Sequence, residues 1–149
     1  MIDIINGTIN VGKGFFVSKG LTKEEFCTSE LYKEVISETH TKGVNYCIKP
    51  QMIGNVIFSI SIQFNIKNMI EIVNLSHSEN IEALSWENYS LDNEKIKKAW
   101  HDNWLKVNLG DPKFVNAHGW ITYKYSWGEI SSVCDPHTTV SSIVFRYNQ

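Results

Sequence analysis

The sequence has little of what marks a secreted, membrane-bound or zinc-binding protein. Its three cysteines, Cys27, Cys47 and Cys134, lie far apart and form neither a disulfide framework nor a Cys-x-x-Cys metal motif. The longest apolar stretch, Val56–Ile62, is much shorter than the roughly 20 residues that span a bilayer. Asp3 stands where a signal peptide would carry a basic region. We therefore expect a cytoplasmic protein with reduced thiols and no membrane attachment.

Motifs of reaction chemistry are also missing. The five histidines share no metal-ligand spacing, and the chain contains no phosphate-binding glycine loop and no nucleophile elbow. Cys134 and His137 flank the dipeptide Asp135-Pro136, and a cysteine nucleophile needs an imidazole within hydrogen-bond reach. The same residues are typical of a turn, because proline fixes φ and aspartate bonds the local backbone. We favour the turn and expect a protein that is not an enzyme, with no catalytic residue, metal or cofactor.

What the sequence does contain is the patterning of a mixed fold. The clearest strand is Val56–Phe64, in which apolar side chains alternate with Ser59, Ser61 and Gln63. Thr22 and Glu25 form a capping box that predicts the start of a helix. The expected elements are two short strands within 2–17, a helix over about 22–38, a strand at 45–48, a hairpin of 56–64 and 69–75, a helix over about 90–109, and a terminal hairpin that turns at Asp135-Pro136.

The two predicted helices differ in their patterning. On the first, Glu30, Glu34 and Glu38 would form a ladder on a solvated face. On the second, Ser90 is the expected N-cap, and a stripe of Ile96, Trp100 and Trp104, joined by Ala99, Val107 and Leu109, is expected to face the core before Gly110 ends the helix. The order ββ-α-βββ-α-ββ predicts a single α+β domain over residues 1–149, with an antiparallel sheet of about six or seven strands and two main helices.

Charge is unevenly placed although the net charge is only −2, which gives no reason to expect direct contact with nucleic acid. Between Lys67 and Lys95 the chain has six acids and no base. An acidic segment that carries aromatic side chains suits a basic protein partner, because charge steers the encounter and aromatics anchor it. The alternative is that the aromatics cover the core while the acids face water. The candidate binding residues are Glu79, Glu82, Trp86, Glu87, Tyr89, Asp92 and Glu94.

Five segments carry a resemblance to a known group of proteins. They are EFCTSELYK (25–33), IKPQMI (48–53), FSISIQF (58–64), WHDNWL (100–105) and YSWGEISSV (125–133) with Asp135-Pro136. Together they resemble immunity proteins of bacterial polymorphic toxin and contact-dependent growth inhibition systems. The resemblance implies a cytoplasmic protein whose partner is the C-terminal domain of one cognate toxin, often a nuclease, which it binds and neutralises. It assigns no particular residue, because contact surfaces in this group vary with the toxin.

Two other interpretations stay open at the level of sequence. A small enzyme or ligand-binding domain would build a pocket from scattered residues, for which Trp100, Trp104, Trp127 and His101 are the candidates. A structural subunit would instead carry a large exposed apolar patch. A core filled by the tryptophans would favour the protein-binding interpretation over the pocket. The oligomeric state does not follow from the sequence.

Overall fold

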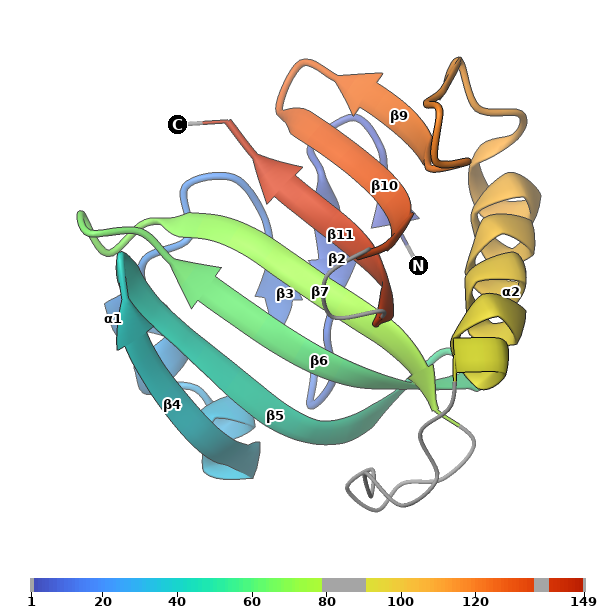
Figure 1. Ribbon diagram of the computed structural model, residues 1–149. Coiled ribbons are helices and arrows are strands. Elements are labelled where there is room, and N and C mark those ends of the chain that lie inside the picture. Colours follow the sequence, from blue (N-terminus) through green and yellow to red (C-terminus); the bar gives the residue numbers. More distant parts are fainter. Residues whose placement is uncertain (1, 79–90, 136–139, 149) are drawn as a thin grey trace.

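A computed structural model describes residues 2–78, 91–135 and 140–148 (Figure 1). The fold is α+β, as predicted, with one antiparallel sheet of eight strands, which we call the large sheet, and one of three, the small sheet. The small sheet contains β1 (Ile2–Asp3), β2 (Thr8–Asn10) and β3 (Phe16–Val17). The large sheet contains β4 (Val35–Thr41), β5 (Gly43–Ile53), β6 (Val56–Phe64), β7 (Ile70–Ser78), β8 (Phe114–Val115), β9 (Ile121–Tyr125), β10 (Gly128–Cys134) and β11 (Ser141–Tyr147). The helices are α1 (Lys23–Cys27), the short 3-10 helix η1 (Glu30–Glu34) and α2 (Leu91–Leu109).

Two meanders joined edge to edge make up the large sheet. Its strand order is β4-β5-β6-β7-β11-β10-β9-β8, so each half runs through consecutive hairpins. The halves meet where β7 pairs with β11, with Leu75 opposite Ile143 and Val73 opposite Phe145. All four of these side chains are buried. The joint therefore lies in the middle of the sheet and of the core.

Local sequence accounts for the β6–β7 hairpin. Val56–Phe64 forms β6 with Phe58, Ile60, Ile62 and Phe64 buried, as the alternation predicted. The turn at Asn65–Asn68 is closed by the Asn65 side chain, whose Oδ1 accepts from the N–H groups of Lys67 and Met69. Asn68 has a φ of 62°, a conformation that asparagine adopts more readily than most residues.

The first predicted helix is wrong beyond its opening turn. The capping box is present, with Thr22 Oγ1 accepting from Glu25 N–H and Glu25 Oε2 accepting from Thr22 N–H. The helix ends at Cys27, and after η1 the chain becomes β4, so Glu38 lies on a strand and the predicted acidic ladder does not form. The β-branched residues at 35, 36, 39 and 41 favour an extended chain and explain the change.

The terminal hairpin is also more elaborate than predicted. Residues 121–134, expected to form one strand from Tyr123 onward, instead form β9 and β10, which turn tightly at Ser126-Trp127. Gly128 begins β10 because a β-carbon there would overlap the backbone oxygen of Arg146 on the neighbouring strand β11. The tight β9–β10 turn adds one strand to the predicted count. The short strand β8, the strand β4 and a third strand near the N-terminus add three more.

One face of the large sheet is covered by the rest of the chain. The small sheet lies behind the large one in Figure 1, and side-chain hydrogen bonds tie the two together. Trp127 Nε1 donates to Ile4 O at 2.8 Å, and Tyr147 Oη donates to Gly7 O at 2.9 Å. On α1, Phe26 packs against Tyr46, with ring centroids 5.2 Å apart.

The long helix α2 covers the same face beside β7, β10 and β11. Its predicted stripe is only partly right: Trp100 and Trp104 pack on Phe58, whereas Ile96 is 68% exposed. Val107 and Ala99 are exposed as well. The fully buried side of α2 carries Glu94, His101 and Leu105 instead. No helix in the described ranges is both long and apolar enough to cross a bilayer.

Candidate functional site

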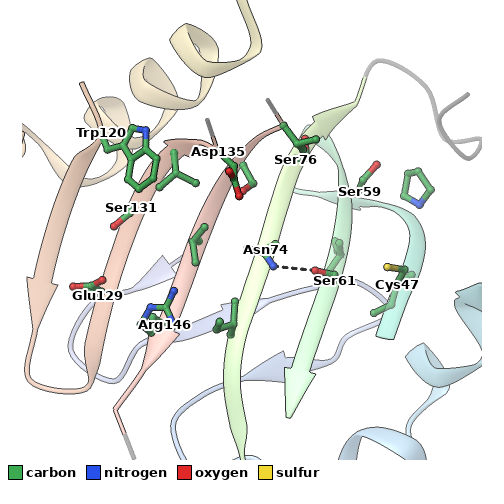
Figure 2. A pocket seen from close by; sticks show the side chains of 18 of the residues that line it. Cys47, Ser59, Ser61, Asn74, Ser76, Trp120, Glu129, Ser131, Asp135 and Arg146 are labelled. Atoms are coloured by element: carbon green, nitrogen blue, oxygen red, sulfur yellow. Dashed lines mark hydrogen bonds between the residues drawn. The ribbon is translucent and has the colours of Figure 1, made fainter. Parts of the chain in front are cut away.

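The face of the large sheet that points away from the core contains a hollow of about 760 Å³ (Figure 2). It extends mainly over β5, β6, β7, β11, β10 and β9, with Ile36 of β4 at its edge. Its lining comes mostly from alternate residues whose neighbours along the strand are buried in the core. We call these side chains the open face. Its serine, threonine and asparagine members are Ser59, Ser61, Asn74, Ser76, Ser131, Ser142 and Thr122.

Strand register places two pairs of short polar side chains, separated by Val144, across the middle of the open face. Ser61 lies opposite Asn74, Asn74 opposite Val144, and Val144 opposite Ser131. The Asn74 amide donates to Ser61 Oγ at 3.1 Å, as Figure 2 shows, and Ser131 Oγ lies 3.0 Å from Thr122 Oγ1. The hollow exists because these side chains are short, while longer ones stand around them.

One end of the open face lies near the end of β7. Ser76 Oγ donates to the Ser141 carbonyl at 3.0 Å, and Asp135 and Val140 complete the lining here. In Figure 2, Trp120 stands beside this end, next to β9. Since β7 ends at Ser78, this is also where the chain enters residues 79–90, which lie outside the described ranges.

The other end is mainly cationic. Arg146, the single arginine of the sequence, lies opposite Glu129, which in turn lies opposite Lys124. Arg146 is exposed, and none of the ion pairs between described residues involves it. Lys124 Nζ stands 4.7 Å from the ring centroid of Phe114 on β8.

A second hollow of about 510 Å³ continues the open face toward β8. It shares Thr122 and Glu129 with the first hollow and is also lined by Lys113, Phe114 and Lys124. Three cations, Lys113, Lys124 and Arg146, therefore stand around one carboxylate. Exposed Phe114 adds an aromatic surface beside them, 48% accessible to solvent.

The chemistry of the open face is that of binding. Its hydroxyl and amide groups donate and accept hydrogen bonds, and arginine and tryptophan at its ends are the residue types that most often anchor protein interfaces. In the described ranges no group of three or more histidine, cysteine or acidic side chains is arranged to hold a metal ion.

The predicted binding residues fall into two groups. Glu79, Glu82, Trp86, Glu87 and Tyr89 lie outside the described residues. Asp92 is exposed in the first turn of α2. Glu94 is only 6% exposed, because its carboxylate accepts from Ser141 N–H at 2.8 Å and contacts Lys97 at 3.3 Å. Its carboxylate thus fastens α2 to the start of β11 inside the protein.

The four residues proposed for a scattered pocket pack into the protein instead. Trp127 is 4% exposed and lies against Tyr147, with ring centroids 5.3 Å apart. Trp100 stacks on His77 at 3.8 Å and, like Trp104, contacts Phe58. None of these tryptophans lines the hollow. Among the described tryptophans, the one that lines it is Trp120.

His101 is fully buried on the inner side of α2. Its Nε2 accepts from His77 N–H at 2.9 Å, so the proton of the neutral ring is on Nδ1. Burial, with lesser effects of Lys97, His77 and Lys98, lowers the pKa of His101 to about 3. The ring is therefore a neutral structural group rather than an acid or base that exchanges protons near neutral pH.

The Cys134–His137 pair gains no support as a site. Cys134 is the last residue of β10, half-buried and paired with Ser141. His137 lies outside the described residues.

Sequence reasoning missed the open face, although a signal was present. In β6 the serines at 59 and 61 alternate with buried Phe58, Ile60 and Ile62. A similar alternation occurs in β7, where Asn74 and Ser76 alternate with buried Val73 and Leu75. The sequence does not show which strands pair in the sheet. It therefore did not show that their polar residues lie together on one face.

Comparisons with known proteins give one informative likeness. No protein-family model matches the chain, and no curated protein matches it. A solved structure, described as "Rhs1-CT in complex with cognate immunity protein RhsI1", is similar to it with a TM-score of 0.55. The likeness covers 99% of this chain and 86% of the matched chain, at 15% identity. The protein therefore shares its fold with a chain of a toxin–immunity complex.

Proposed function

We propose that the protein is a non-catalytic immunity protein that binds the C-terminal domain of a cognate bacterial toxin and neutralises it by covering its active or substrate-binding surface. The observation that carries this proposal is the likeness in fold to a chain of the Rhs1-CT–RhsI1 complex over almost the whole of this chain. The sequence resemblance to immunity proteins and an open face suited to binding support the same role.

A nuclease is the toxin that we expect. Enzymes that hold nucleic acid are basic where they contact phosphate, and an acidic inhibitor can occupy that surface. The acidic segment Glu79–Glu94 supplies such charge, with Asp92 on the exposed side of α2. We propose that its remaining acids, together with Trp86 and Tyr89, face the toxin, while Glu94 holds the segment's end to the sheet.

Co-expression with the product of the adjacent toxin gene tests the role. We expect a one-to-one complex, with nanomolar affinity measured by titration, and restored growth of cells that produce the toxin. If the neighbouring protein forms no complex and its toxicity persists, the chain is not its immunity protein.

Charge reversal tests the acidic segment separately. Replacing Glu82 and Glu87 with lysine should slow association by at least about tenfold at low salt, because steering depends on long-range charge. Stopped-flow association at several salt concentrations measures the effect, and Glu24→Lys with Glu30→Lys, two exposed acids of the α1–η1 region, is the matched control. An unchanged association rate would remove the acidic segment from the interface.

The volume of the hollow favours a second candidate, a domain that binds a small polar ligand. About 760 Å³ lies within the range of small-molecule sites, roughly 300–1,000 Å³. Such sites, however, enclose their ligand, whereas this hollow is open and spreads across six strands. A thermal-shift screen with polar metabolites tests this candidate, and a stabilising ligand together with no toxin binding would favour it.

A further inference from the structure

We propose that the open face of the large sheet is a docking surface for the cognate toxin domain, and that an acidic, protruding segment of that domain lies against Arg146. This inference rests on the proposed immunity function and adds to it the place and the chemistry of the contact. It assigns a role to a surface distinct from the acidic segment.

Shape is the first argument. The centre of the open face is low because Ser61, Asn74 and Ser131 carry short side chains, while Trp120 and Arg146 stand at its ends. A convex segment of a partner fits such a hollow. The short side chains lose little conformational entropy on binding, so their hydrogen bonds cost less to form than those of long side chains.

Charge is the second argument. At the β8 side, Lys113, Lys124 and Arg146 surround Glu129 alone, and Arg146 makes no ion pair with another described residue. A guanidinium group binds a carboxylate through two parallel hydrogen bonds, which fixes both position and orientation. A partner that offers an aspartate or glutamate here complements this end of the face.

Size is the third argument. Six strands spaced about 4.8 Å apart are about 24 Å across, and the six-residue step from Glu129 to Asp135 along β10 is about 20 Å long. The product, about 480 Å² as a flat projection, increases when side-chain relief and the second hollow are included. It approaches the roughly 800 Å² that each partner contributes to a standard interface.

The carboxylate at the opposite end is the fourth argument. The end of the open face at Ser76 is also lined by Asp135. A toxin domain that lies along the face therefore meets a carboxylate at one end and Arg146 at the other. This two-sided complementarity excludes partners that match only one charge.

The alternative occupants fit less well. A second copy of this chain would oppose one hollow to another, which encloses a void instead of filling it. A small ligand would leave most of the six-strand face uncovered. The experiment described next distinguishes both alternatives from a toxin domain.

The test is an affinity titration of an active-site-inactivated toxin domain against four variants. Ser61→Trp fills the centre of the hollow and should weaken binding at least 100-fold. Arg146→Glu reverses the anchor charge without touching the core and should weaken binding at least tenfold. Asn103→Trp and Lys106→Glu make the same kinds of change on the exposed side of α2 and should alter affinity less than twofold. Melting curves confirm that each variant is folded.

Each outcome has a separate meaning. If wild type binds and both open-face variants bind equally well, the docking surface is elsewhere and the immunity function stands. If Ser61→Trp abolishes self-association in sedimentation experiments while toxin affinity is unchanged, a second copy occupies the face and this inference is overturned. If Ser61→Trp does not fold, the Arg146→Glu result decides, with unchanged affinity counting against the inference. If wild type does not bind the toxin domain, the immunity function and this inference fall together.

Discussion

At the scale of single residues, Gly7 determines how closely the small sheet approaches the core. Its φ of 68° favours glycine, and a β-carbon would overlap the indole ring of Trp127. Gly7→Ala should therefore destabilise the protein by about 2–4 kcal/mol, combining backbone strain with overpacking. Gly54, which has a φ of 63° and no atom within 4 Å of the position that a β-carbon would take, is the matched control. Gly54→Ala should cost about 1–2 kcal/mol in urea denaturation, from strain alone.

His101 makes stability depend on pH. Its folded-state pKa of about 3 lies below the usual value of 6.5, so the unfolded chain takes up the proton first as the pH falls. The free energy of unfolding should decrease by up to about 1.4 kcal/mol per pH unit between about pH 6 and pH 4 because of this group. His101→Gln should flatten that part of the profile in chemical denaturation. His118→Gln, which changes an exposed ring, should not.

At the scale of elements, Glu94 shows that a helix can be fixed by a polar contact. Its carboxylate accepts from the N–H of Ser141, and Ser141 Oγ donates to the Glu94 carbonyl at 2.6 Å. Glu94→Ala leaves the buried Ser141 N–H unpaired and should cost about 1–3 kcal/mol of unfolding free energy. Asp92→Ala, on the exposed side of the same turn, should change the melting midpoint by less than about 2 °C. Equal effects of the two substitutions would contradict this role for Glu94.

Elements with a strong local signal could be predicted from the sequence. The β6–β7 hairpin has strict alternation and an asparagine-rich turn, and α2 ends at Leu109 just before Gly110, as expected. The helix over 22–38 failed because a good capping box governs only the first turn, whereas β-branched residues downstream favour a strand. The buried side of α2 was misplaced because Glu94 and His101 find partners on strands that are distant in sequence.

The open face belongs to the scale of the whole molecule, and that is why sequence reasoning did not find it. The open face forms only because β7 and β11, whose paired residues Leu75 and Ile143 are far apart in the chain, lie side by side. No local pattern specifies that pairing. An acidic run, by contrast, can be recognised from consecutive residues of the sequence, which explains why the predicted binding residues lie within 79–94.

The shared core predicts that the two meanders unfold together. Trp100, Trp104, Trp120 and Trp127 all follow β7, so tryptophan fluorescence reports mainly on the second half of the chain, while far-UV circular dichroism reports on every strand and helix. We expect the two signals to give the same urea midpoint and a single transition, as a one-domain protein should. Two separate midpoints would show that the halves are independent units.

The central pairing of β7 with β11 also has a consequence during synthesis on the ribosome. The half of the open face that follows β7 cannot form until residues 141–147 have left the exit tunnel. The small sheet cannot take its final position before Trp127 and Tyr147 are available to hydrogen-bond it. Contacts of such long range make folding slow, on the order of milliseconds to seconds. The open face therefore takes shape only once β11 has been made, so chains that stop before β11 would lack half of this surface.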